Sequence, residues 1–330
     1  MRASGPRPRR GAASAWGFSA PARDARDGLW HAFSTVACGT AGVVGDGGGE
    51  SFIAHLTAAR EEGPFSLLRM FSPQTTFGPM SAVAADGTFV LIFRVNVLLD
   101  NATVCAGAAP APSPALPASA DVPAADLVSG DPEVGTSIWV AWSRGGPAGP
   151  FDVARVNITG AGEVHKSNPS IAQLADGRWL MAYRYNPPGG SLNAIAVADD
   201  FRGPYENTAN VTVADGAHGG DEDPFGFVLP ASPTIAHMLY HNRQYGYHAW
   251  GPINGSAPWR VGNTSHAFTL SVPLDDGSVL ALGRRERPAL RFDASGAPVA
   301  LINGVQEGGR AGQCDSFVQP LRAAAAGAAY

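Results

Sequence analysis

Three stretches of this chain share one pattern: SFIAHLTAAREEGPF (residues 51–65), SIWVAWSRGGPAGPF (137–151) and NAIAVADDFRGPY (193–205). Each begins with alternating apolar residues, which is the pattern of a half-buried β-strand, and continues through a short polar loop. Each then ends on Gly-Pro and an aromatic residue. The Gly-Pro pair must leave the strand direction, because proline has no N–H to donate to a neighbouring strand. One strand–loop–turn unit is therefore used three times.

An Asp-Gly pair forms a second repeat, interleaved with the first. It precedes the apolar runs LWHAF, FVLIF, RWLMAY and VLAL, at Asp27-Gly28, Asp86-Gly87, Asp176-Gly177 and Asp276-Gly277. Asp-Gly before such a run is typical of a tight β-hairpin. Repeated use of one antiparallel unit predicts an all-β chain, a five-bladed β-propeller with four antiparallel strands per blade.

The repeats divide one domain, residues 16–322, into five blade-sized units. The units span about 16–68, 76–158, 168–212, 221–270 and 278–321. We expect 1–15 to be a disordered or targeting tail, 323–330 a second tail, and the Pro- and Ala-rich segment 106–133 a loop insertion. A proline recurs at the start of the units, at Pro21, Pro79, Pro169, Pro224 and Pro288. Because first strands line the axis of a propeller, the neighbours of these prolines are expected to converge there.

Composition argues against several classes of function. The formal net charge of −5 provides no basic surface for nucleic acid. No apolar run is long enough to span a membrane. The sequence has no CxxC, no HExxH, no calcium loop and no Gly-rich phosphate loop. We therefore expect no metal, no cofactor, no nucleic-acid partner and no membrane partner, and a monomer.

Glycosylation sequons point to export. They lie at Asn101, Asn157, Asn210, Asn254 and Asn263. Chance alone gives about one or two such matches in a chain of this composition, so the excess predicts a secreted glycoprotein. Residues 1–20 lack the apolar core of a signal peptide. Secretion therefore requires a start upstream of this sequence, and an organellar transit segment or a disordered tail is the alternative.

The fourth unit carries a cluster of candidate catalytic carboxyls in HGGDEDPF (218–225). Cleavage of a glycosidic bond needs a protonated carboxyl to assist the leaving oxygen and a carboxylate to activate water or attack the sugar. Asp221, Glu222 and Asp223 lie side by side, and mutual repulsion would raise the pKa of at least one. A solvated acidic turn is the alternative interpretation.

The fifth unit contributes RRERP (284–288). Glu286 is the candidate second catalytic carboxyl, and Arg285 and Arg287 are expected to fix sugar hydroxyls or a carboxylate. A self-neutralising surface cluster is the alternative. Further substrate-binding groups are expected at Asp221, His165, Asn168, Arg184, His241 and His266.

Several of these stretches together resemble glycoside hydrolase family 43-like five-bladed propellers, over most of residues 16–322. They are DGLWHAF, SFIAHLTAAREEGPF, SNPSIAQLADGRWLMAYR, GGDEDPFGFV, HMLYHN, SHAF and RRERPALRFDASGAPVALINGV. The resemblance implies a relation to arabinanases and xylosidases and, more distantly, to invertases and levansucrases. It also implies three carboxyls on successive inner strands: an Asp base, an Asp that tunes a pKa, and a Glu acid. Glu222, followed by Asp-Pro, matches the acid.

The other two carboxyls do not match. Ser19-Ala20-Pro21 stands where the base is expected, and Asn168 stands where a carboxylate often lies. The base has moved to Asp223 or Glu286, or the chain binds glycans without cleaving them. One hypothesis is a metal-independent, inverting glycosidase that acts on plant or algal polysaccharide or oligosaccharide. The other is a catalytically lapsed propeller that binds glycan or protein.

Overall fold

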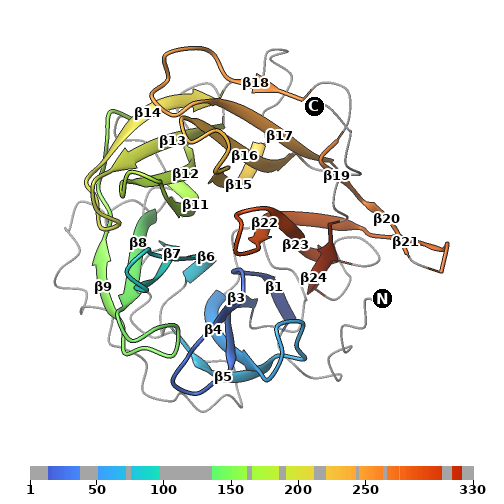
Figure 1. Ribbon diagram of the computed structural model, residues 1–330. Coiled ribbons are helices and arrows are strands. Elements are labelled where there is room, and N and C mark those ends of the chain that lie inside the picture. Colours follow the sequence, from blue (N-terminus) through green and yellow to red (C-terminus); the bar gives the residue numbers. More distant parts are fainter. Residues whose placement is uncertain are drawn as a thin grey trace.

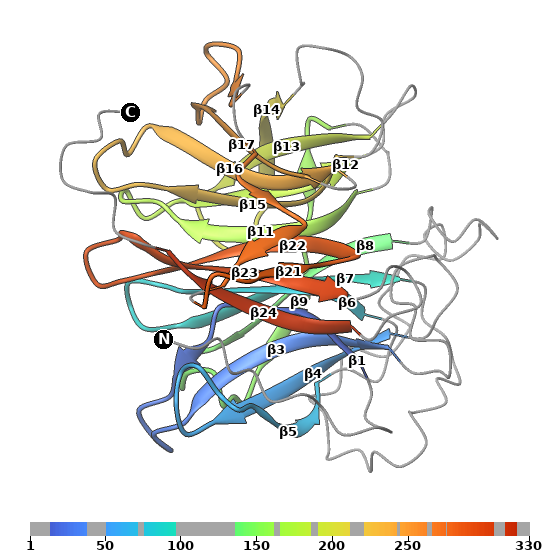
Figure 2. The ribbon, with the colours of Figure 1, turned by 90° about the vertical axis from the view of Figure 1, so that its right-hand side faces the viewer.

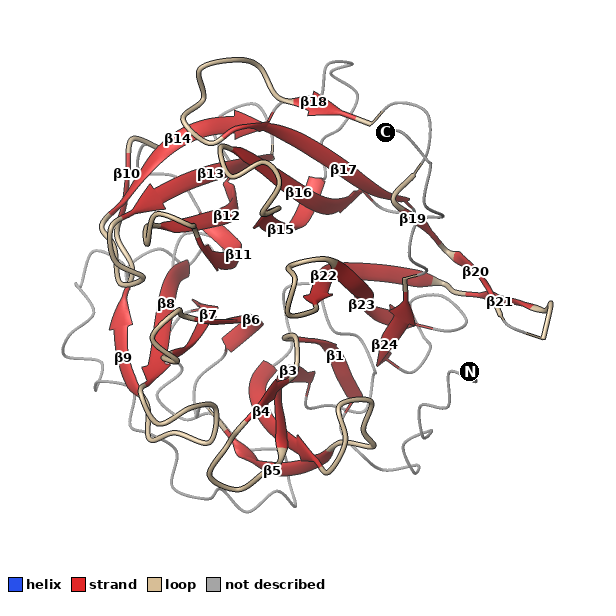
Figure 3. Ribbon diagram, viewed as in Figure 1, coloured by secondary structure: helices blue, strands red, loops and turns tan. Residues whose placement is uncertain are grey.

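The computed structural model contains five antiparallel β-sheets arranged in a ring, which confirms the predicted five-bladed β-propeller (Figure 1). It describes residues 14–37, 51–71, 76–96, 136–161, 166–185, 191–211, 221–242, 245–262, 266–274, 276–306 and 314–321. Strands and loops make up this described part, and it contains no helix (Figure 3). Accordingly, no helix among these residues is long and apolar enough to cross a membrane.

The strands follow one another around the ring. Blade 1 contains β1 (Ser14–Phe18), β2 (Ala22–Arg23), β3 (Trp30–Ala37), β4 (Ser51–Ala58) and β5 (Ser66–Met70). Blade 2 contains β6 (Thr76–Val83), β7 (Phe89–Asn96), β8 (Thr136–Ser143) and β9 (Asp152–Arg155). Blade 3 contains β10 (Ile158–Thr159), β11 (Lys166–Gln173), β12 (Trp179–Tyr185), β13 (Leu192–Ala198) and β14 (Tyr205–Val211). Blade 4 contains β15 (Asp221–Val228), β16 (Ile235–Asn242), β17 (Tyr245–Pro252), β18 (Arg260–Val261) and β19 (Phe268–Thr269).

Blade 5 is smaller than predicted. Its sheet has three strands, β22 (Arg284–Phe292), β23 (Pro298–Gln306) and β24 (Cys314–Pro320), where four were expected. The preceding β20 (Ser271–Pro273) and β21 (Val279–Ala281) form a separate hairpin. The ring closes where β1 of blade 1 lies against β23 and β24, as the side view shows (Figure 2).

The Asp-Gly pairs form the predicted hairpins. Gly28, Gly87, Gly177 and Gly277 all have positive φ, between 73° and 90°, which glycine adopts without steric cost. In each hairpin the aspartate accepts a hydrogen bond from the backbone N–H two residues later, at Leu29, Thr88, Arg178 and Ser278. The fourth of these turns joins β20 to β21, outside the main sheet of blade 5.

Apolar side chains fill the spaces between the blades. The largest cluster includes Val90 and Ile92 of blade 2, Met181 and Tyr183 of blade 3, and Leu239 of blade 4. Burial of such side chains stabilises the ring by about 1.5–3 kcal/mol each. Blades 2, 3 and 4 therefore share one continuous core, which fixes how their inner strands face one another.

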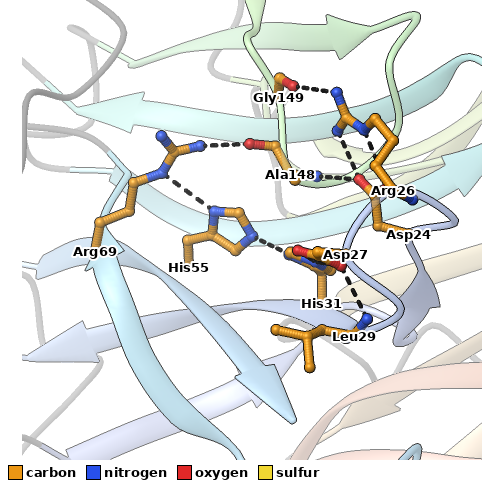
Figure 4. Close-up of polar contacts among 9 residues, drawn as sticks. All are labelled: Asp24, Arg26, Asp27, Leu29, His31, His55, Arg69, Ala148 and Gly149. Carbon is orange, nitrogen blue, oxygen red and sulfur yellow. Dashed lines mark hydrogen bonds and ion pairs between the residues drawn. The ribbon is translucent and has the colours of Figure 1, made fainter. Parts of the chain in front are cut away.

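A chain of polar groups joins blade 1 to blade 2 (Figure 4). Arg69 Nη2 donates to the carbonyl of Ala148 (3.0 Å), and its Nε donates to Nδ1 of His55 (3.3 Å). Nε2 of His55 lies 2.8 Å from Nδ1 of His31, whose Nε2 lies 3.1 Å from Oδ2 of Asp27. Both imidazole rings are buried.

The partners in this chain determine where the protons lie. Arg69 is only a donor, so Nδ1 of His55 accepts, and neutral His55 carries its proton on Nε2. Nε2–H of His55 then donates to Nδ1 of His31. His31 in turn donates from its Nε2–H to Asp27. Burial, together with the neighbouring His31 and Arg69, lowers the pKa of His55 to about 3. His55 is thus neutral at physiological pH.

The sequons that the structure describes lie on its surface. Asn157, Asn210 and Asn254 are exposed, as glycosylation requires. Asn101 and Asn263, the loop insertion 106–133 and most of both predicted tails lie outside the described residues.

Candidate functional site

The innermost strands of the five blades share one backbone irregularity. Each contains a residue with a φ between 50° and 65°, where its pairing with the second strand changes register. These residues are Gly17 (61°), Gly78 (65°), Asn168 (50°), Asp223 (54°) and Arg287 (50°). This φ strains a residue other than glycine, so its recurrence at equivalent points of three blades marks this level of the axis as a candidate site.

Four of these positions are followed directly by a repeat proline, namely Pro79, Pro169, Pro224 and Pro288. Proline suits the point at which the ladder is interrupted. In blade 1, Phe18 follows Gly17, and Pro21 lies beyond the end of β1. The expectations that Pro21 marks this inner strand and that Ser19-Ala20-Pro21 stands at the axial position are therefore wrong. Gly17 is the equivalent residue.

Arg287 of blade 5 connects three other blades at the axis. Its guanidinium carbon lies 3.7 Å from the ring centre of Phe77 in blade 2, and Nη2 lies 3.7 Å from Oδ1 of Asp223 in blade 4. A β-carbon added to Gly17 would lie 3.0 Å from Cδ of Arg287, and one added to Gly78 would lie 2.7 Å from Nη1. The two glycines therefore leave the space that the Arg287 side chain fills.

Asp223 is the buried anion of this cluster, with an exposed fraction of 4%. Its Oδ1 accepts a hydrogen bond from Nδ2 of Asn168 (2.6 Å), and its Oδ2 lies 3.0 Å from Nε2 of His241. Burial opposes the ionisation of Asp223, but Arg287 and the hydrogen bond to His241 outweigh it and hold the pKa of Asp223 well below its usual range. Asp223 is thus a permanent carboxylate that organises its neighbours.

Glu222 is more accessible, with 37% of its side chain exposed. Nη1 of Arg184 donates to its Oε1 (2.8 Å), and Nε of Arg184 donates to Oγ of Ser191 (2.6 Å). Nε2 of His241 lies 4.0 Å from Oε2 of Glu222. Glu222 therefore presents a carboxylate to solvent at the mouth of the axial cluster, oriented by an arginine of the neighbouring blade.

Glu286 is held by its own strand. Nε and Nη2 of Arg284 donate to its two carboxylate oxygens (2.6 and 2.9 Å), a bidentate pair. Arg285, which alternates to the other side of β22, donates to Oδ1 of Asn303 (2.9 Å) and to Oε1 of Gln319 (2.7 Å). Burial lowers the pKa of Arg285 to about 10. The hydrogen bonds of Arg285 tie β22 to β23 and β24 and lie away from the axis, whereas Arg287 lies at the axis.

Within the part of the chain that the structure describes, four buried polar atoms of the cluster have no hydrogen-bond partner. They are Oγ of Ser167, Oδ1 of Asn168, Nδ1 of His241 and Nε of Arg287. Buried polar groups in folded proteins are nearly always paired with protein or water, so their concentration here indicates a site that takes water or a ligand.

The described residues include one group with the spacing of a metal site. Ligand atoms of Glu222, Asp223 and His241 lie within 4.8 Å of one another. Although burial opposes it, the hydrogen bond to Asp223 raises the pKa of His241, which favours an imidazolium that cannot bind a metal. The guanidinium of Arg287 adds a second positive charge beside Asp223. These residues fit paired ions better than a bound cation.

The remaining predicted site residues fall elsewhere. His165 lies outside the described residues, and Asp221 is the first residue of β15, with a side chain that is not described. His266 is exposed and stacks on Tyr245, with ring centres 3.8 Å apart, so it lies outside the axial cluster. Sequence reasoning missed Gly17 and Gly78. A glycine at the start of a repeat unit is a weak signal, because this sequence has many glycines.

Neither a protein-family model nor a curated protein matches the sequence. Solved structures do match the fold. A thermostable family-43 glycoside hydrolase is 10% identical, covers 97% of this chain and 94% of its own, and has a TM-score of 0.58. The chain has the propeller fold of glycoside hydrolase family 43.

Two further enzymes have the same propeller. One is a GH43 β-xylosidase/α-arabinofuranosidase from a compost microbial metagenome, solved with xylotriose. It is 14% identical, the match covers 98% of this chain and 96% of that enzyme, and the TM-score is 0.58. The catalytic domain of the GH62 α-L-arabinofuranosidase of Coprinopsis cinerea is 12% identical, with coverage of 97% and 95% and a TM-score of 0.57. At these identities the likeness establishes the fold.

Proposed function

We propose that this propeller binds an oligosaccharide at the axial cluster, with the partly exposed Glu222 and Arg184 as the groups that contact the sugar, and does not cleave it. The observation that carries the proposal is the pairing of the carboxyls. Among the described residues of the cluster, Glu222, Asp223 and Glu286 are each held by a cationic side chain.

Hydrolysis would require two of these groups to act as acid and base. An inverting enzyme holds its carboxyls about 6.5–9.5 Å apart, and a retaining one about 5–5.5 Å. Asp223 is buried and ionised, so it has no proton to give and does not reach a substrate. Both carboxylate oxygens of Glu286 already accept hydrogen bonds from Arg284, so this carboxyl is engaged within its own strand.

The first-blade position also argues for binding. The resemblance places a base on the inner strand of blade 1, where this chain has Gly17. The Arg287 side chain fills that space. A cation at this point cannot accept a proton from water.

The fold relatives support a choice of sugar class. The metagenomic enzyme was solved with xylotriose, and the relatives are named for xyloside and arabinoside linkages. We therefore propose plant-type pentose oligosaccharides as ligands of this chain, bound by a monomer. The exposed sequons support a secreted glycoprotein as the setting for such a ligand.

Isothermal titration calorimetry with arabino- and xylo-oligosaccharides tests the proposal. Glu222→Gln and Arg184→Gln should each weaken binding about tenfold or more, because a hydrogen bond to a charged group contributes about 1.5–3 kcal/mol. Arg178→Gln is the matched control: Arg178 is exposed and pairs with Asp176 next to the β11–β12 hairpin. Equal affinities in all four proteins would exclude this site.

Inverting hydrolysis with Glu222 as the acid is the second candidate. The observation in its favour is that 37% of the Glu222 side chain is exposed, so that a leaving group can approach it. In that case Glu222→Gln would remove the proton donor and lower the rate by a factor of about 10² to 10⁴.

A further inference from the structure

Blade 4 carries an aromatic pair at the same end as Glu222. Across this blade, Glu222 pairs with His241, His241 with Gly246, and Gly246 with Phe268. Tyr245 is the residue before Gly246, so it lies one residue nearer the end of the strands. Glu222 on the inner strand and Tyr245 on the third strand therefore lie at the same end of blade 4.

Tyr245 and His266 form a flat, accessible stack. Their ring centres are 3.8 Å apart at an interplanar angle of 13°, and Tyr247 meets His266 edge-on at 5.6 Å. Tyr245 is 39% exposed and His266 is also exposed. Tyr247 thus adds an edge-to-face contact to the His266 ring of this stack.

The position of the stack suits a longer glycan. Neighbouring strands lie about 4.8 Å apart, so β17 lies about 10 Å from β15 along the blade. A few linked sugar units span that distance. The polarised C–H groups on the apolar face of a sugar ring are attracted to the negative face of an aromatic ring, and its hydroxyls point outward to water. Flat aromatics beside charged hydrogen-bonding groups are a common composition for such a site.

We propose that the Tyr245–His266 stack is a second sugar-binding subsite, which extends the axial site outward over blade 4 and selects oligosaccharides over single sugars. This inference rests on the proposed function, because the chain that reaches Tyr245 is anchored at Glu222. In this proposal His266, which the sequence analysis placed among the substrate-binding groups, contacts the sugar at this outer position and by stacking.

The test is calorimetry with xylo- and arabino-oligosaccharides of increasing length, from one unit to six. In the unmodified protein, affinity should rise once the chain is long enough to reach Tyr245. Tyr245→Ala should remove that rise, a loss of about threefold to tenfold for long ligands, and leave the shortest ligands unaffected. Tyr245→Phe, which keeps the ring, should retain the rise.

Two controls separate this subsite from the axial site. Val83→Ala removes another exposed apolar side chain, at the end of β6 next to a hairpin, and should change nothing. Glu222→Gln should weaken binding at every length. An unchanged length dependence in Tyr245→Ala would overturn the subsite and leave the proposed function intact. If the unmodified protein binds no oligosaccharide, the proposed function fails, and the subsite fails with it.

Discussion

Arg287 occupies the space that a side chain at Gly78 would need: an added β-carbon would lie 2.7 Å from Nη1 of Arg287. The two residues lie on different blades, and the arginine reaches across the axis to Phe77 and Asp223. The Arg287 side chain therefore brings a guanidinium among residues of three other blades at the axis. That arrangement favours recognition of oxygen-rich ligands over activation of water.

Substituting Gly78 tests this packing. Gly78→Ala should destabilise the protein by about 1–3 kcal/mol, because it displaces Arg287 and places alanine at a φ of 65°. Gly87→Ala is the control, since Gly87 has a φ of 84° with nothing within 4 Å of an added β-carbon. The free energy of unfolding from urea titration should fall more for Gly78→Ala. Equal losses of unfolding free energy in the two variants would mean that a methyl group at position 78 does not displace Arg287.

Removing the charge of Asp223 should be costly. Asp223→Asn leaves Arg287 and His241 buried without their anion, and breaking such a buried pair costs about 3–5 kcal/mol. The hydrogen bond to Asp223 raises the pKa of His241, so NMR titration should show that pKa falling in the variant. If Asp223→Asn changed neither the stability nor the pKa of His241, the assigned ion pair would be contradicted.

Stability should decline as pH falls below the ordinary histidine range. The folded-state pKa of His55, about 3, lies below its unfolded value of about 6.5, so the unfolded chain binds more protons between these pH values. The contribution of His55 is complete above about pH 6.5 and is lost towards pH 3, at about 1.4 kcal/mol per pH unit. Thermal unfolding at pH 7 and pH 5 measures the loss.

Glutamine at position 55 isolates this effect. Its amide oxygen can accept from Arg69 and its amide nitrogen can donate to His31, without a titrating proton. His55→Gln should therefore show a shallower dependence of stability on pH than the unmodified protein. An identical slope in His55→Gln would show that His55 is not the responsible group.

The secretory prediction has a direct readout. In a eukaryotic secretory host, the exposed Asn157, Asn210 and Asn254 should carry glycans that glycopeptide mass spectrometry detects. Asn→Gln at each site should remove the corresponding mass without changing the fold. Unmodified peptides at all three positions would argue against passage through the secretory pathway.

The sequence predicts the local features of the fold better than those of the site. Asp-Gly hairpins depend on a few adjacent residues, and each forms where expected, including the one that lies outside the main sheet of blade 5. Three axial positions, Asn168, Asp223 and Arg287, are predicted as site residues from the sequence, whereas Gly17 and Gly78 are missed, although Pro79 follows Gly78. The contact between Arg184 and Glu222 joins two blades. It depends on how the blades face each other, which no local pattern encodes.

The most direct test of the central claim is to measure binding and cleavage in one sample. The purified protein, in excess over a xylo- or arabino-oligosaccharide that it binds by calorimetry, is incubated and the sugars are analysed by chromatography. Binding with no change in the oligosaccharide after prolonged incubation is the predicted result. Shorter products that appear with the unmodified protein and disappear with Glu222→Gln would contradict the account and establish hydrolysis.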